Sequence, residues 1–159
     1  MKVQYVGIGE IKVATTKDEQ LKVMALGSCV AVIFYAYKLH VSAIAHVALP
    51  SSGSSNISTR PGYYADLAVQ HLIDTFRNLG VEKNNELLIK LVGGAAIMDN
   101  GSVFNIGQRN VIAVKKHLWQ NRLGALREDV GCNFSRSLTL NNLSGIVTIS
   151  SPERGHWEI

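Results

Sequence analysis

The sequence of 159 residues has little cysteine and no long hydrophobic run, and each scarcity excludes a class of protein. Two cysteines, Cys29 and Cys132, cannot build a disulfide framework, and no Cys-x-x-Cys pair occurs. The longest apolar run, residues 29–37, is far shorter than the roughly 17 residues that a membrane-spanning helix needs. No apolar segment follows Met1 as in a signal peptide. We therefore expect a cytoplasmic protein without direct membrane insertion.

The sequence also lacks a strong charge of one sign. Lys and Arg number 16 against 12 Asp and Glu, and Lys115-Lys116 is the only basic doublet. Aromatic residues make up 7% of the chain and are not interleaved with basic ones, so we expect no nucleic-acid partner. With 47% hydrophobic residues, the chain is apolar enough to bury a substantial core. We expect one globular domain over residues 1–159.

Metal and nucleotide motifs are missing as well. No His, Cys or carboxylate pair has the short spacing of a zinc site. The glycines at Gly7 and Gly9, and those at Gly93 and Gly94, are not followed by the other elements of a dinucleotide or phosphate-binding motif. We therefore expect no metal site and no phosphate-binding loop.

Hydrophobic periodicity predicts strands in the first half of the chain and two helices later. The expected strands cover residues 3–8, 11–15, 21–25, 30–37, 41–49 and 86–92, with two or three more after 126, among them 134–140 and 146–150. One helix carries an apolar stripe from Ala65 to Leu79 and ends at Gly80; the other begins at the cap residue Asn105 and ends near Gly124. Two helices cannot cover both faces of a large sheet, which favours a layered α-β-β sandwich.

The segment 50–61 is rich in serine and bounded by two prolines, which is typical of a loop. Two interpretations remain open at this point. The segment is either a plain connection or a rim over a functional site.

Cys29 is the candidate nucleophile of the sequence. It follows Gly27 and Ser28, which place it in a turn where backbone N–H groups can stabilise an oxyanion. His46 lies in the next strand-like run and can act as the base that removes the thiol proton. A free cysteine is often only a small buried hydrophobe, and a lone histidine in an apolar strand is more often a core residue than a base. Both interpretations stay open until the two side chains are placed.

At these residues the chain resembles the CheD family of chemoreceptor glutamine deamidases. The resemblance runs over almost the whole chain as an ordered series of motifs. The motifs are Val6-Gly7-Ile8-Gly9-Glu10, Leu26-Gly27-Ser28-Cys29-Val30-Ala31-Val32, Ala45-His46-Val47-Ala48-Leu49-Pro50, Tyr64-Ala65-Asp66, Gly93-Gly94-Ala95, Asn105-Ile106-Gly107-Gln108-Arg109-Asn110-Val111, Glu128-Asp129-Val130-Gly131 and Arg136.

The resemblance implies an activity, a fold and partners. The family converts selected glutamines of methyl-accepting chemotaxis receptors to glutamate, with release of ammonia and without a cofactor or metal. By the resemblance, Cys29 is the nucleophile, His46 the base, and the turn at Gly27 and Ser28 supplies the oxyanion donors. The implied fold is similar to that of the cytotoxic necrotizing factor toxins. A CheC-type phosphatase is an implied partner, and receptor arrays in the cytoplasm are the implied location.

The chain departs from the family pattern at three positions outside these motifs, and one of them is Phe134, where a polar residue is common. Val23 stands where the family commonly has a threonine that orients the histidine, and valine cannot accept a hydrogen bond. Either a backbone carbonyl orients His46 instead, or the histidine is poorly fixed and the enzyme slow. Cys132 replaces a glycine that usually follows Gly131, and we expect it to be structural.

Two alternative functions use the same sequence features. The chain is either a deamidase or a module that binds receptors or the CheC-type phosphatase with weak or no catalysis, as Val23 favours. A third reading is a thiol hydrolase that acts on the glutamine of another protein or on a small amide.

Overall fold

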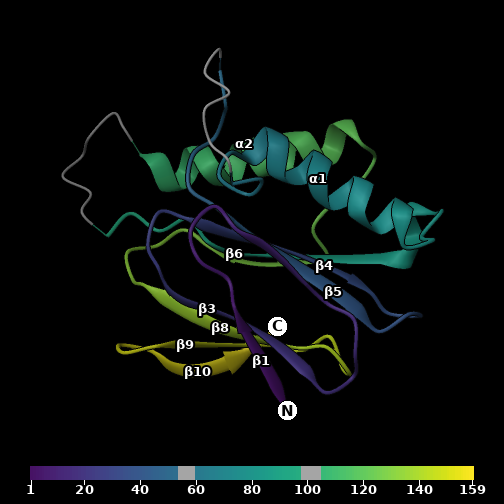
Figure 1. Ribbon diagram of the computed structural model, residues 1–159. Coiled ribbons are helices and arrows are strands. Elements are labelled where there is room, and N and C mark those ends of the chain that lie inside the picture. Colours follow the sequence, from purple (N-terminus) through teal and green to yellow (C-terminus); the bar gives the residue numbers. More distant parts are fainter. Residues whose placement is uncertain (54–59, 98–104) are drawn as a thin grey trace.

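The chain folds into three layers, as seen in a computed structural model that describes residues 1–53, 60–97 and 105–159. This part contains two five-stranded sheets and two α-helices (Figure 1). Both helices lie over one face of the central sheet, and the outer sheet packs against the opposite face. The expected α-β-β sandwich is therefore confirmed.

The elements have the following bounds. The central sheet has the order β2-β5-β4-β6-β7, with β2 at Ile11–Ala14, β5 at Val41–Val47, β4 at Val30–Ala36, β6 at Leu87–Gly93 and β7 at Arg127–Val130. The outer sheet has the order β1-β3-β8-β9-β10, with β1 at Lys2–Tyr5, β3 at Glu19–Leu26, β8 at Arg136–Asn141, β9 at Val147–Ser151 and β10 at Gly155–Glu158. The helices are α1 at Ala65–Asn78 and α2 at Ile106–Gln120, and a short 3-10 turn spans Asn84–Glu86.

Strands β4 and β5 are buried along their whole length, as their continuous apolar runs predict. Alternate side chains enter two different cores. Val32 and Phe34 pack with the helices, whereas Ala31 and Ile33 pack in the inter-sheet core between the two sheets. The strand pair that carries the candidate residues is therefore the centre of the fold.

The outer sheet has one covered face. Strands β8 and β9 alternate strictly between buried and partly exposed residues, because only one face meets the central sheet. Leu138, Leu140, Val147 and Ile149 supply that inner face and complete the inter-sheet core.

Each helix is followed, two residues after its last residue, by a residue with positive φ. After α1 this residue is Gly80, as predicted, and the N–H of Val81 donates to the carbonyl of Phe76. After α2 it is Arg122, with φ 60°, so this helix ends before the predicted Gly124. The predicted start of α2 is confirmed, since the Asn105 side chain accepts a hydrogen bond from the N–H of Gln108.

The tail contains four strands rather than two or three. The two strands that were not predicted by position are β7 and β10, which lie at the free edges of the two sheets. Edge strands are short and carry polar residues, so β7, with the sequence Arg-Glu-Asp-Val, lacks the alternation by which strands are recognised. Most of the predicted loop at 50–61, namely residues 54–59, lies outside the described residues.

A buried arginine ties the two sheets together near the end of β3. Arg136 on β8 is 1% exposed, and its Nε donates to Asp129 Oδ1 on β7 at 2.8 Å. Its Nη1 donates to the carbonyl of Gly131 at 2.9 Å. Trp157 on β10 donates to the other oxygen of Asp129 at 2.5 Å, so the arginine's charge is paired and one carboxylate of the central sheet binds two strands of the outer sheet.

The helical layer can be tested with two leucines of α1. Leu72 is fully buried, whereas Leu67 is 40% exposed. We expect Leu72→Ala to lower the free energy of unfolding by about 2–5 kcal/mol, because it leaves a cavity against the central sheet. Leu67→Ala makes the same chemical change at the surface and is expected to cost about 0.5 kcal/mol or less. Urea unfolding measures both, and equal losses would contradict the packing described here.

Candidate active site

Cys29 lies in the short connection between β3 and β4, as its Gly-Ser neighbours predict. The bend falls at residues 27–28, and Cys29 is partly buried against the inter-sheet core. Two backbone groups after β6 hold this connection. The N–H of Ala95 donates to the Gly27 carbonyl at 2.9 Å, and the N–H of Gly94 donates to the Cys29 carbonyl at 2.8 Å. The backbone on both sides of the thiol is therefore fixed.

The third carbonyl of the connection is held by a side chain. Asn110 of α2 donates from Nδ2 to the Ser28 carbonyl at 2.9 Å and to the Ala48 carbonyl at 3.1 Å. All three carbonyls from Gly27 to Cys29 thus accept a hydrogen bond. This role of Asn110 was not predicted from the sequence, although its place among the apolar positions of α2 marks it as a polar residue facing the core.

His46 lies on the same strand face as Cys29. It is 4% exposed and opposes Ala31 in the β4–β5 ladder, in which Val30 opposes Val47. Ala31 belongs to the inter-sheet core, and Cys29 packs against the same core. Cys29 and His46 are therefore diagonal neighbours on one face at one end of the strand pair, a separation that side chains can span.

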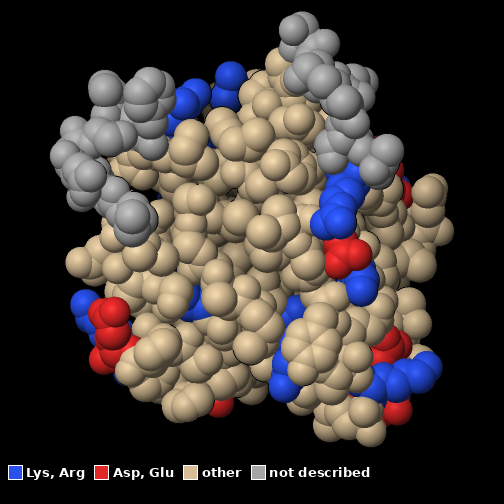
Figure 2. Space-filling view, turned by 60° about the vertical axis from the view of Figure 1, so that its left-hand side comes forward, with Lys and Arg blue, Asp and Glu red and all other residues tan. Residues whose placement is uncertain are grey.

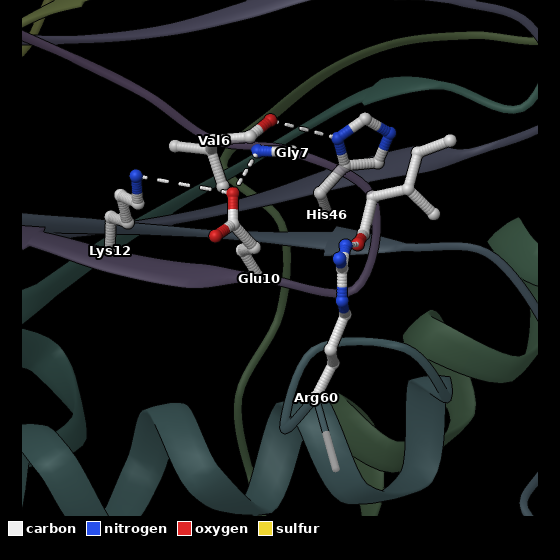
Figure 3. Close-up of polar contacts among 7 residues, drawn as sticks. Val6, Gly7, Glu10, Lys12, His46 and Arg60 are labelled. Atoms are coloured by element: carbon white, nitrogen blue, oxygen red, sulfur yellow. Dashed lines mark hydrogen bonds and ion pairs between the residues drawn. The ribbon is translucent and has the colours of Figure 1, made fainter. Parts of the chain in front are cut away.

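A backbone carbonyl orients the histidine. His46 Nδ1 lies 3.0 Å from the carbonyl oxygen of Val6 (Figure 3). A carbonyl oxygen only accepts, so Nδ1 carries the proton and Nε2 keeps the free lone pair of a base. Val23, the position predicted to matter for orientation of the histidine, is fully buried in the inter-sheet core. It lies beside the Val6 contact, because Tyr5 opposes Lys22 in the parallel pairing of β1 with β3 and the next residues are Val6 and Val23.

The segment that supplies this carbonyl wraps around His46. The N–H of Gly9 donates to the His46 carbonyl at 2.8 Å, and the N–H of His46 donates to the Glu10 carbonyl at 3.0 Å. The Glu10 carboxylate accepts from the N–H of Gly7 at 2.7 Å, and Arg60 Nη1 donates to the Ile8 carbonyl at 2.5 Å (Figure 3). The position of the Val6 carbonyl is thus set by a network and not by one contact.

The two candidate groups are both neutral at rest. Burial raises the pKa of the Cys29 thiol above its ordinary value. Burial lowers the pKa of the His46 imidazole, and the hydrogen bond to Val6 and the charge of Glu10 act in the opposite direction. At neutral pH the arrangement is therefore a thiol with a neutral imidazole, and the thiolate forms only when a base takes its proton.

Exposed apolar side chains lie beside the connection that carries Cys29. Figure 2 shows a face on which Lys and Arg are scattered among uncharged residues and not gathered in one patch. Ile8 and Ile97 are about half exposed, and Ile97 Cδ1 lies within van der Waals reach of the Gly27 position. Such a surface fits an uncharged side chain better than a charged one. Among the described residues no group of three or more His, Cys, Asp or Glu could hold a metal ion.

Comparison with known proteins places the chain in a family. A family model described as CheD chemotactic sensory transduction matches residues 48–151. A protein of Syntrophotalea carbinolica named probable chemoreceptor glutamine deamidase CheD is 44% identical over 156 residues, which cover 96% of each chain. The chain belongs to the CheD family. The chemoreceptor glutamine deamidase CheD of Thermotoga maritima is 41% identical over 140 residues, covering 88% of this chain and 86% of that one.

The CheD family model begins after both candidate residues. Its match starts at residue 48, so Cys29 and His46 lie outside it. The helices of this CheD chain, in the part that the structure describes, include none long and apolar enough to cross a membrane.

Gly93 provides a test of how the thiol is positioned. Its φ is 115°, and a Cβ there would lie 2.3 Å from the Cys29 carbonyl oxygen. We expect Gly93→Ala to lower the melting temperature by several degrees, because strain of about 1–3 kcal/mol adds to the clash. Gly80→Ala is the matched control, since its φ is 97° and nothing lies within 4 Å of its Cβ position. Equal shifts in the two variants would show that the clash with Cys29 has no effect.

The charge state of the thiol can be measured by alkylation. In a Cys132→Ser background, we expect the rate of iodoacetamide reaction at Cys29 to rise with pH around a midpoint that is higher in the folded protein than in urea. Burial opposes the thiolate, which is the reactive form. A folded-state midpoint below the one in urea would contradict a neutral resting pair and indicate a thiolate–imidazolium pair.

Proposed function

We propose that this CheD-family chain, acting as one domain over residues 1–159, hydrolyses the side-chain amides of selected glutamines in methyl-accepting chemotaxis receptors. Cys29 is the nucleophile and His46 the base, and neither a cofactor nor a metal takes part. The observation that carries the proposal is the buried His46 with its Nδ1 proton bound to the Val6 carbonyl, on the strand face of Cys29. The names of the relatives supply the substrate.

The reaction begins with a proton transfer from the thiol to His46 Nε2. Cys29 Sγ then forms a bond to the amide carbon of glutamine, and the carbonyl oxygen becomes an oxyanion held by N–H groups at the Ser28–Cys29 turn. When the intermediate collapses, the carbon–nitrogen bond breaks and His46 gives its proton to the leaving nitrogen, which departs as ammonia. A thioester on Cys29 remains.

The second half of the reaction uses the same two residues. His46 Nε2 takes a proton from water as the water oxygen bonds to the thioester carbon. The carbon–sulfur bond then breaks, His46 returns the proton to Cys29, and the product is glutamate. The alternating role of His46 requires an imidazole that is neutral at rest, which agrees with the lowered pKa of His46.

The remaining partners belong to the same proposal. A CheC-type phosphatase and a location at cytoplasmic receptor arrays follow from the family resemblance.

The proposal is tested by incubating a purified cytoplasmic fragment of a chemoreceptor with the protein. We expect ammonia release and a mass gain of about 1 Da per converted glutamine with the wild type. Cys29→Ala should lower the rate by at least about 10³-fold, because it removes the nucleophile. Cys132→Ala is the matched control and should retain activity.

Either of two results would contradict the proposal. Conversion by Cys29→Ala at the wild-type rate would exclude Cys29 as nucleophile. Receptor binding without conversion by any variant, the wild type included, would instead support the binding-module alternative.

A further inference from the structure

A buried amide at the back of the candidate site has no role in the proposed reaction. Asn110 is fully buried on α2, next to Val111 and Val114 of the helical core. Its Oδ1 has no hydrogen-bond partner among the described residues. A buried acceptor without a partner costs about 1–3 kcal/mol, so the contribution of this side chain to stability is at least partly cancelled.

Both N–H bonds of the Asn110 amide donate to carbonyls at the same end of the β4–β5 strand pair. Nδ2 donates to the Ser28 carbonyl just before β4 and to the Ala48 carbonyl just after β5. Val30 opposes Val47 in the ladder, so these carbonyls lie at the end of the strand pair that carries Cys29 and His46. Because both partners can only accept, the orientation of the amide is fixed with its nitrogen toward them.

The contact with Ser28 also fixes a neighbouring N–H group. The Ser28–Cys29 peptide is trans, so the N–H of Cys29 points opposite to the Ser28 carbonyl. The carbonyl points to Asn110 on α2, and the N–H therefore points away from the helical layer. The Cys29 side chain packs on that same side, against the inter-sheet core. No acceptor among the described residues engages this N–H.

From this arrangement we infer that Asn110 is a positioning residue for the oxyanion: by holding the Ser28 carbonyl, it aims the Cys29 N–H at the carbonyl oxygen of the substrate amide. This inference rests on the proposed function. It assigns the oxyanion donor to one peptide group and explains why a polar residue stands among the apolar positions of α2. The second bond, to Ala48, fixes the amide itself and keeps the ends of β4 and β5 in register.

The test compares two reactions of the same thiol. Deamidation of the receptor fragment forms an oxyanion, whereas alkylation by iodoacetamide does not. Asn110→Asp keeps the size of the side chain and removes the donors, and Asn110→Ala removes the amide. We expect both variants to lower kcat about 10²-fold, the effect of losing one oxyanion donor, with KM and the alkylation rate within about threefold of wild type.

Val114→Ala is the matched control, because Val114 is fully buried on the same helix and is not bonded to the Cys29 connection. It should destabilise the fold while kcat stays near the wild-type value. If Asn110→Ala fails to fold, Asn110→Asp alone decides the outcome.

Three outcomes overturn the inference. They are a kcat within threefold of wild type in Asn110→Asp, a parallel fall in alkylation, and an equal loss of kcat in Val114→Ala. Wild type and Cys29→Ala in the same assay distinguish a failure of the proposed function from a failure of the inference on Asn110. A wild type without activity, or a fully active Cys29→Ala, overturns the proposed function and the inference with it.

Discussion

The antiparallel pairing of β4 with β5 sets the positions of all the residues at the candidate site. With Val30 opposite Val47, Cys29 and His46 share the inter-sheet face. A slip of one residue would turn His46 toward the helices and away from the face of Cys29. The register is protected because both strands are buried on both faces, so a slip would disturb two cores at once.

The site is built mainly from the main chain around two side chains. Backbone N–H groups hold the carbonyls of Gly27 and Cys29, and a backbone carbonyl holds the histidine. The two candidate groups at this site are neutral at rest. In the proposed reaction, oriented peptide dipoles supply the polarity, and they require no rearrangement as charge develops.

Much of this arrangement can be predicted from the sequence, because its signals are local. The apolar runs of β4 and β5, the stripe of α1, the cap at Asn105 and the turn before Cys29 all depend on neighbouring residues. The features that were missed are of three other kinds. Edge strands such as β7 are polar, the end of α2 uses Arg122 where glycine is usual, and the role of Asn110 depends on two distant carbonyls.

The partner of His46 illustrates the same limit in a sharper form. A backbone carbonyl was one of two alternatives predicted for the partner of His46, but no residue type in a sequence marks such a carbonyl. Every residue has one, and only the course of the chain from β1 to β2 places that of Val6 against the imidazole. The identity of the residue at position 6 matters for the core, and not for the hydrogen bond itself.

Because a main-chain carbonyl orients His46, the contact responds to substitutions differently from one made by a side chain. A side-chain orienter disappears with a single codon change, whereas the carbonyl at position 6 persists through any substitution that preserves the path of the chain. Scanning by alanine replacement would therefore pass over this contact without detecting it. The histidine is instead vulnerable to insertions and deletions in residues 6–10, where the length of the segment, and not its chemistry, decides whether the carbonyl reaches the ring.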